Sequence, residues 1–317
     1  MHEKEHKTIL EAIAERPLIS DGAMGTQLHA AGLEIGHCPE QWNLTHPDRV
    51  LEIHREYVAA GADCLITQTF GASAINLARH GLAEFTEEIN TAGVNIARRA
   101  FGGGRGYVLG GMGPFGGLLK PFGTVKAEEA RAAFGQQATA LVAAGVDGII
   151  IETQTALEEL GLAIEAAREA GATCIIGSVA FDITRNGRDA RTMMGVTPEK
   201  AAEFLQASGA HVAATNCGTG VDTEWMSKIV ARYRTACNLP LMAKPNAGKP
   251  VLEGGHWVYK QSPEQMAAGL DRLLDAGARI VGTCCGSTAA HIVLFRRIVD
   301  RRIAEQQSRQ IDQRSQS

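Results

Sequence analysis

The chain has 317 residues, and 31 lysines and arginines against 35 aspartates and glutamates give it a formal net charge of −4. This balance excludes a protein that binds nucleic acid through bulk positive charge, and a composition of 45% hydrophobic and 21% charged residues excludes a disordered or fibrous chain. No segment has the roughly 18 to 20 apolar residues of a membrane helix, and residues 1–7 lack the apolar segment of a secretory signal, so we expect a cytosolic protein without membrane contact.

Along the chain, one pattern recurs: an alanine-rich helical segment, a glycine, and a short apolar run. A glycine just past a helix adopts the left-handed conformation that ends it. Continuous apolar runs are typical of parallel strands that are covered on both faces. We predict eight such strands: Leu18–Asp21, Cys64–Thr69, Tyr107–Met112, Gly148–Glu152, Cys174–Val179, His211–Cys217, Pro240–Asn246 and Ile280–Cys284.

The spacing of these strands indicates the fold. They begin about 37 residues apart, which is enough for a strand, a helix and two connections. Eight such units predict an α/β protein with a single (β/α)₈ TIM barrel. An open doubly wound sheet is the alternative, but no Gly-x-Gly-x-x-Gly follows the first strand, and the glycines within residues 102–106 precede a strand instead.

The predicted domain organisation is simple. Residues 1–302 form one barrel domain, because no linker or change of composition divides them. Residues 303–317 are rich in glutamine, serine and arginine and have no apolar period. We therefore expect a polar, disordered tail there.

Polar residues stand at the predicted C-terminal strand ends, where barrel enzymes build their active sites. Asp21 and Glu152 could act as an acid–base pair or could hold a cationic group such as an ammonium. A glycosidase also needs two carboxylates, but its sugar platforms are aromatic and this chain is only 5% aromatic. Thr69 and Asn246 end two further strands, and Thr69 could equally cap the following helix.

Three of the seven cysteines suggest a metal centre. Cys217 ends one predicted strand, and Cys284 and Cys285 end another, with Gly282 and Gly286 permitting a turn around the pair. Three thiolates with an open fourth position are typical of catalytic zinc. The alternatives are a redox-active thiol pair or buried core cysteines. We predict structural roles for the other four: Cys38, Cys64, Cys174 and Cys237.

Six motifs, in order within roughly residues 8–300, together resemble the homocysteine S-methyltransferase family. The likeness is greatest to the homocysteine-binding module of cobalamin-dependent methionine synthase. The motifs are Asp21-Gly22-Ala23-Met24-Gly25-Thr26, Thr67-Gln68-Thr69-Phe70-Gly71-Ala72, Glu152-Thr153, Asn216-Cys217-Gly218, Pro245-Asn246-Ala247-Gly248 and Gly282-Thr283-Cys284-Cys285-Gly286.

The resemblance implies a zinc-bearing (β/α)₈ barrel with Cys217, Cys284 and Cys285 as metal-binding and catalytic residues. It also implies that Asp21, Gly22 and Glu152 bind the amino-acid end of homocysteine, and we add Thr69 and Asn246 to this substrate-binding set. A free thiol with a pKa near 8.5 is mostly protonated at pH 7, so coordination of the substrate sulfur by Zn²⁺ would supply the thiolate that is methylated to methionine.

The methyl donor stays open at this point. In the family, 317 residues do not accommodate cobalamin and folate modules, so we expect either methylcobalamin on a separate corrinoid protein or an onium donor such as betaine or S-methylmethionine. An onium donor would call for an aromatic cage, for which Trp257 and Tyr259 are candidates. The segment from Phe115 to Phe122 departs from the family pattern and could shape the pocket or only pack the loop. Another thiol acceptor, or a non-catalytic metal or redox sensor, are the remaining alternatives.

Overall fold

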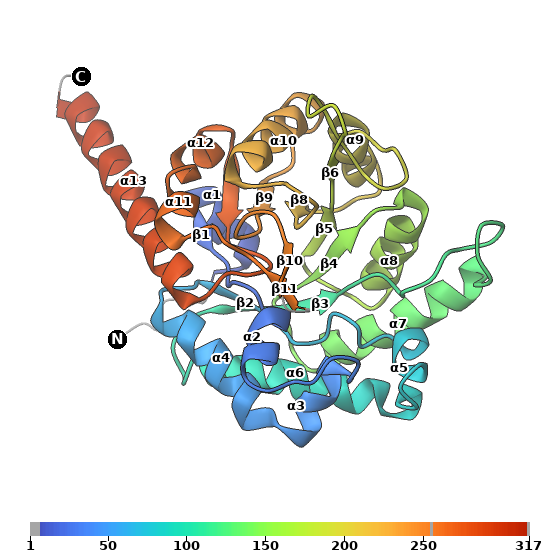
Figure 1. The fold of residues 1–317 in the computed structure, drawn as a ribbon. Coiled ribbons are helices and arrows are strands. Elements are labelled where there is room, and N and C mark those ends of the chain that lie inside the picture. The colour runs from blue at the N-terminus through green and yellow to red at the C-terminus, as the bar shows by residue number, and fades with distance from the viewer. Residues whose placement is uncertain (1–6, 254–255, 316–317) are drawn as a thin grey trace.

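The computed structural model describes residues 7–253 and 256–315, and its centre is a ring of eight parallel strands surrounded by helices (Figure 1). The ring confirms all eight predicted strands, with ends that differ by a few residues. They are β1 (Leu18–Ile19), β2 (Cys64–Ile66), β3 (Tyr107–Met112), β4 (Gly148–Gln154), β5 (Ile175–Val179), β8 (Val212–Asn216), β9 (Leu241–Lys244) and β12 (Ala278–Val281).

The strands close into a barrel. Their order is β1-β12-β9-β8-β5-β4-β3-β2, and a parallel bridge between Ser20 and Cys64 joins the first strand to the second. The backbone N–H of Asp21 donates to the carbonyl of Cys64 at 3.0 Å, and that of Asp63 donates to the carbonyl of Ile19 at 2.7 Å. The predicted TIM barrel is therefore confirmed, and the open doubly wound sheet is excluded.

Helices follow the strands and cover the outside of the barrel (Figure 1). The recurring glycine between a helix and the next strand has a left-handed φ angle, between 76° and 106°, at all five of these positions: Gly61, Gly145, Gly171, Gly209 and Gly277. The helices are α1 (Ile9–Glu15), α2 (Gly25–Ala30), α3 (Trp42–Thr45), α4 (Pro47–Ala59), α5 (Ala74–Ala78), α6 (Thr86–Ala100), α7 (Ala127–Ala143), α8 (Leu157–Glu169), α9 (Pro198–Ala207), α10 (Thr223–Ala236), α11 (Pro263–Ala267), α12 (Leu270–Asp275) and α13 (Ala289–Ser315).

The core has two layers, which explains why the strands are apolar without alternation. Side chains of successive strand residues point to opposite faces. In β4, Ile150 belongs to the cluster inside the barrel, whereas Ile149 and Ile151 pack in the layer between the barrel and the helices. Helix α1 closes the N-terminal end of the barrel, where Ile9 and Ile13 join the inner cluster.

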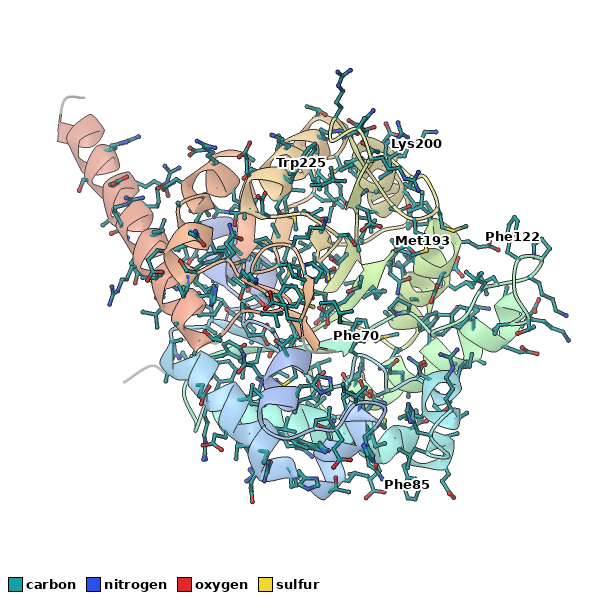
Figure 2. All side chains as sticks on the ribbon, in the orientation of Figure 1. Phe70, Phe85, Phe122, Met193, Lys200 and Trp225 are labelled. Atoms are coloured by element: carbon teal, nitrogen blue, oxygen red, sulfur yellow. The ribbon has the colours of Figure 1, made fainter. Side chains whose placement is uncertain are left out.

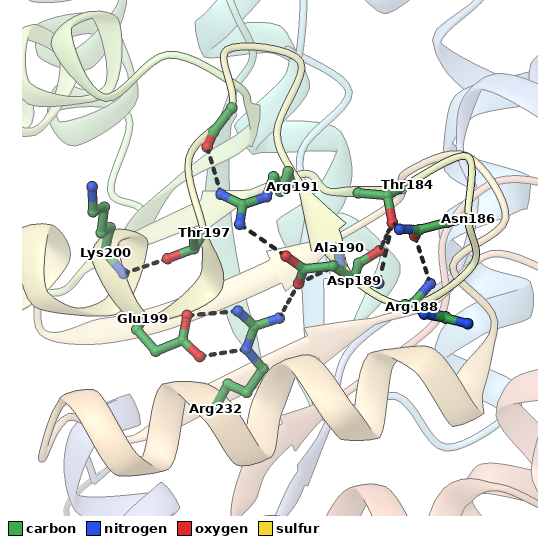
Figure 3. Close-up of polar contacts among 11 residues, drawn as sticks. Thr184, Asn186, Arg188, Asp189, Ala190, Arg191, Thr197, Glu199, Lys200 and Arg232 are labelled. Carbon is green, nitrogen blue, oxygen red and sulfur yellow. Dashed lines mark hydrogen bonds and ion pairs between the residues drawn. The ribbon is translucent and has the colours of Figure 1, made fainter.

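Two hairpins that the sequence did not predict lie in connections after strands. One is β6 (Asp182–Ile183) with β7 (Ala190–Arg191), and the other is β10 (Val251–Glu253) with β11 (His256–Val258). Figure 3 shows how the first is held on α10: the Arg232 guanidinium lies 2.7 Å from Oδ1 of Asp189 and 2.7 Å from Oε2 of Glu199. These bonds lower the pKa of Glu199 to about 2.

The C-terminal segment differs from the expectation. Residues 303–315 continue α13, which projects away from the barrel (Figure 1), where we expected a disordered tail. The segment contains neither proline nor glycine, and glutamine, glutamate and arginine form helices well. Arg301 also pairs with Asp271 of α12 at 2.6 Å and with Glu305 one turn later. The absence of an apolar period after residue 302 therefore indicates where the helix stops packing on the core, not where the helix ends. The domain division at residue 302 stays a prediction.

We expect removal of residues 305–317 to leave the barrel intact. The side chains of residues 304–309 are exposed, so their loss uncovers no core surface, and surface changes of this kind are within about 0.5 kcal/mol. Thermal unfolding of the truncated and complete chains should give midpoints within a few degrees of each other. A large drop would contradict this assignment.

None of the helices in the described ranges is both long and apolar enough to cross a bilayer.

Candidate metal and substrate site

Three cysteine sulfurs meet at the C-terminal end of the barrel. Cys217 follows β8, and Cys284 and Cys285 follow β12. The Sγ of Cys285 lies 3.9 Å from that of Cys217 and 4.0 Å from that of Cys284, and all three lie within 4.8 Å of one another. Sulfurs bound at about 2.3 Å to one tetrahedral zinc ion would be about 3.8 Å apart. The three thiols are therefore close enough together to bind one zinc ion.

The backbone brings these sulfurs together through two unusual turns. Cys217 has a φ of 59°, which is rare for a residue other than glycine and turns its side chain out of the strand direction. The Cys284–Cys285 turn is held by the segment that follows β9, because the N–H of Cys284 donates to the carbonyl of Pro245 at 2.8 Å and the N–H of Ala247 donates to the carbonyl of Cys285 at 3.0 Å. Both vicinal cysteines can thus face one point.

Polar groups around the sulfurs fix their positions. The Asn216 amide Nδ2 lies 3.9 Å from Sγ of Cys284, and its Oδ1 accepts from Oγ of Ser178 at 2.6 Å. The same amide binds both the N–H and the hydroxyl of Thr153, at 3.0 and 2.9 Å, and so holds that residue at a φ of 58°. The Tyr259 hydroxyl hydrogen-bonds the thiol of Cys285. Such contacts orient ligands in metal sites.

A cavity of about 300 Å³ opens directly on the three sulfurs. Its wall contains Asp21, Gly22 and Glu152 of the predicted substrate-binding set. The wall is formed by residues 21–26, 39–40, 66–68, 70, 152–153, 216–217, 244 and 284–285.

Two predicted substrate-binding residues, Thr69 and Asn246, do not line the cavity. Thr69 is buried and donates its hydroxyl to the carbonyl of Gly111 at 2.7 Å. Asn246 is buried and donates its amide to the carbonyl of Gly218 at 3.1 Å, which supports the loop after Cys217. Both therefore act on the backbone behind the cavity wall.

Gly22 is required by close packing. A Cβ atom at this position would lie 2.7 Å from the ring and the hydroxyl oxygen of Tyr57. That hydroxyl donates to the carbonyl of Ala23 at 2.7 Å and so holds the loop after β1 in place. Only glycine allows the backbone of this loop to form the cavity wall.

Of the three charged groups at the base of the cavity, Lys244 and Asp21 are buried and Glu152 is half-buried. Nζ of Lys244 lies 2.8 Å from Oδ1 of Asp21, and both side chains are 4% exposed. Burial by itself would lower the pKa of Lys244, but the charges of Asp21 and Glu152 outweigh it, and the pKa is raised. Burial raises the pKa of Glu152 to about 7, against the opposing effect of Lys244.

The raised pKa of Glu152 makes stability depend on pH. The folded metal-free chain holds this proton more tightly than the unfolded chain, so the favourable contribution is complete below about pH 4.5 and is lost as the pH rises through about 7. The variant E152Q keeps a neutral side chain at every pH. We expect the unfolding free energy of the metal-free chain to fall relative to that of E152Q between pH 5 and pH 8, as measured by urea denaturation. If the difference in unfolding free energy between the two proteins stayed constant from pH 5 to pH 8, the raised pKa of Glu152 would be contradicted.

Two residues of the site were not predicted as such, Lys244 and Asn216. Lys244 is a lysine inside an otherwise apolar strand, and that mismatch with a buried strand was the available signal. Asn216 precedes a cysteine in a motif that we noted, but its links to Thr153 and Ser178 join three strands and are visible only in the fold.

The remaining predicted features lie away from the cavity wall. Cys38, Cys64, Cys174 and Cys237 are buried, as expected for structural residues. Phe115 is buried against Phe134, with ring centroids 6.2 Å apart, and so packs its loop. Phe122 is 78% exposed at the edge of the molecule (Figure 2). The side chain of Trp257 lies outside the described residues.

Comparisons with known proteins identify relatives of this chain. The family model described as homocysteine S-methyltransferase matches residues 18–299. The methionine synthases of Mycobacterium tuberculosis (strain ATCC 25618 / H37Rv) and Mycobacterium leprae (strain TN) are 32% and 33% identical to the chain in alignments 308 residues long, each of which covers 90% of this chain. The chain spans about a quarter of the length of these relatives, 25% and 24%.

A solved structure has the same fold. The metallated form of the homocysteine methyltransferase MmuM from Escherichia coli superimposes with a TM-score of 0.73 at 25% identity, over 90% of this chain and 98% of that one. Its oxidized form gives a TM-score of 0.71 at 24% identity, over 88% of this chain and 95% of that one.

Proposed function

Since the chain belongs to the homocysteine S-methyltransferase family and is a methyltransferase, we propose that it methylates the thiol of homocysteine to form methionine, with zinc bound by Cys217, Cys284 and Cys285. One observation supports this most strongly: the three sulfurs share their cavity with two carboxylates, Asp21 and Glu152. A thiol at one end and a cationic amine at the other are the two ends of homocysteine.

Zinc would supply a deprotonated substrate thiol when it is bound at the three cysteines. Without a metal these thiols keep their protons, because the hydrogen bond from Cys217 and burial raise the pKa of Cys284. The family member MmuM is known in a metallated form, which agrees with a metal role for this cluster.

The residues around the cavity have separate roles in this proposal. Asn216 and Tyr259 hold the sulfurs of Cys284 and Cys285, and a metal bound at the three cysteines would be reached by the substrate thiol from the cavity. Gly22 lets the substrate approach the backbone after β1 closely. Ile66 and Phe70 supply apolar wall, which keeps water from the reacting sulfur.

Exposed apolar side chains favour a protein-borne methyl donor. In the described ranges, all the large apolar residues that are exposed lie in connections that follow barrel strands, the side on which the cavity opens. Figure 2 shows Phe70 near the barrel centre, with Met193 and Phe122 toward one edge. The complete set of exposed large apolar residues in the described ranges is Ile35, Phe70, Phe85, Leu118, Phe122, Met193, Met194, Val251 and Leu252.

Contiguous apolar surface is typical of protein interaction sites, whereas single exposed apolar side chains are ordinary. The neighbouring pairs Met193–Met194 and Val251–Leu252, and Phe70 in the cavity wall, are the part of this set that supports a protein-borne donor. We therefore propose a separate corrinoid protein, carrying methylcobalamin, as the donor. An onium donor such as betaine or S-methylmethionine has less support, because Phe70 is the only aromatic residue among the described residues of the cavity wall.

Methionine formation tests the function and the donor together. The zinc-loaded protein is incubated with homocysteine under reducing conditions, with methylcobalamin, betaine or S-methylmethionine as donor. Of the three donors, we expect only methylcobalamin to support turnover. Turnover with betaine or S-methylmethionine would instead identify that compound as the methyl donor. No turnover with any donor, together with a reversible Cys284–Cys285 disulfide, would indicate a redox sensor instead.

A further inference from the structure

One of the three cysteines stands at the start of a strained turn. Cys217 and Gly218 have consecutive left-handed φ angles, 59° and 93°. Glycine adopts this conformation freely, but a residue with a side chain keeps it only where its surroundings impose it. Because the turn brings the Cys217 thiol to those of Cys284 and Cys285, whatever imposes the turn also places a candidate metal ligand.

The peptide group that follows the turn is held at both of its polar ends. It consists of the carbonyl of Gly218 and the N–H of Thr219. The carbonyl accepts from Nδ2 of Asn246 at 3.1 Å, and the N–H donates to Oδ1 of Asp182 at 2.7 Å. Because a peptide group is planar, two hydrogen bonds at its opposite ends fix its orientation, and with it the ψ angle of Gly218.

Asp182 lies on a segment that is itself fixed. It begins β6, which is paired with β7, and the N–H of the next residue, Ile183, donates to the carbonyl of Thr219 at 3.3 Å. At the other side of the hairpin, Arg232 of α10 binds Asp189, as Figure 3 shows. A carboxylate on a hairpin that is tied to a helix can hold a neighbouring loop in place, whereas one on a loose segment would move with that loop.

The hydrogen bond from Thr219 to Asp182 is near water, which determines what its loss would change. Asp182 is half-buried and Thr219 is exposed. If the carboxylate is removed, water can accept from the N–H of Thr219, so the fold loses little stability. Water does not hold the peptide group in one orientation, and the turn at Cys217 becomes freer. A metal ion that needs all three sulfurs must then restrict this turn when it binds, which weakens its binding.

We propose that Asp182 is a positioning residue for Cys217. Through the N–H of Thr219 it holds the turn after β8 in the conformation that brings the thiol to the metal. This inference rests on the proposed function, because it takes the three cysteines as a metal site. It places a contributor to that site in a hairpin that lies outside the six sequence motifs, at a residue that does not line the cavity.

Titration of the metal-free protein with Co²⁺ and with Zn²⁺, under reducing conditions, tests the role of Asp182. D182A removes the acceptor, and we expect it to bind both ions about 10- to 100-fold more weakly than the wild type, as for other contacts that orient ligands. D182N keeps an oxygen that can accept from the N–H of Thr219, so its affinity should stay close to that of the wild type.

The matched control is N186A in the same hairpin. Oδ1 of Asn186 accepts from the N–H of Arg188 at 3.0 Å and from the hydroxyl of Thr184 at 2.8 Å, and neither bond reaches the turn at Cys217. N186A should bind both ions as the wild type does. The urea midpoints of the metal-free D182A and N186A chains should both stay near that of the wild type, which separates a loss of position from a loss of folding.

The spectrum of bound Co²⁺ distinguishes a misplaced thiol from a missing one. At saturating Co²⁺, D182A should recover the thiolate-to-cobalt charge-transfer absorption of the wild type, because all three cysteines are still present. C217S, which lacks one sulfur, should show a weaker band at any Co²⁺ concentration. A weak band in saturated D182A would mean that Cys217 no longer binds the metal at all, and so would overturn a role limited to positioning.

The other outcomes are equally decisive. D182A that binds both ions as tightly as the wild type would overturn the inference, and so would D182N that binds as weakly as D182A, since charge and not the hydrogen bond would then matter. N186A as weak as D182A would assign the effect to the whole hairpin. If the wild type binds neither ion through its cysteines, the proposed metal site is wrong, whatever the role of Asp182.

Discussion

Replacing Cys217 by serine is expected to remove most of the bound zinc and to lower methionine formation by at least about 100-fold, beyond the 10- to 100-fold typical of an outer contact. Serine keeps the size of the side chain but offers a hydroxyl, which stays protonated at neutral pH and is a poor zinc ligand. Two sulfurs would remain, and the substrate thiol would no longer complete a tetrahedral set of four. Metal analysis should show about one zinc per wild-type chain and much less in C217S.

The matched control is Cys237→Ser. Cys237 is also a buried free cysteine, but it lies at the end of α10, away from the cavity wall. C237S should keep both zinc and turnover. If C217S kept full zinc content and activity, the three-cysteine site would be ruled out, and if C237S lost zinc as C217S does, the loss would reflect general unfolding.

Replacing Gly218 by alanine is expected to destabilise the chain by about 2 to 4 kcal/mol and to weaken zinc binding with it. Gly218 has a φ of +93°, and a Cβ atom there would lie 1.8 Å from the carbonyl oxygen of Phe181, a backbone atom that cannot turn aside. The loop would have to move, and Cys217 is the residue next to it. Urea unfolding and zinc content measure the two effects.

Gly220→Ala provides the control in the same loop. Gly220 also has a positive φ, +77°, but an added Cβ would meet only the flexible end of Ile183 at 3.3 Å. G220A should therefore carry only the backbone strain of about 1 to 2 kcal/mol and keep its zinc. Equal losses of stability in the two variants would contradict the steric argument and leave only the left-handed backbone as the cause.

The sequence was sufficient to predict the barrel because the patterns that indicate its strands and helices are local. Each strand that is covered on both faces must be apolar throughout, so the apolar runs counted the eight units, and a glycine after the preceding helix marked five of the junctions. The hairpins β6–β7 and β10–β11 escaped prediction because strands of two or three residues carry too few side chains to show a period.

The sequence also placed Cys217, Cys284 and Cys285 together, because the C-terminal ends of barrel strands meet at one face whatever the loops do. It could not determine which polar residues face the cavity. Thr69 and Asn246 stand at strand ends as Asp21 and Glu152 do, but their hydrogen bonds turn them to the backbone, and these depend on neighbours far away in the chain.

The tertiary structure alone determined the electrostatics of the site. Asp21 and Lys244 are 223 residues apart in the chain, and only closure of the barrel brings them to 2.8 Å. The sequence by itself determined the fold and the three thiols, since both follow from local patterning and from the geometry of parallel strands. Which carboxylate pairs with the lysine was decided by side-chain packing across the barrel, because a buried charge is governed by the groups around it in space.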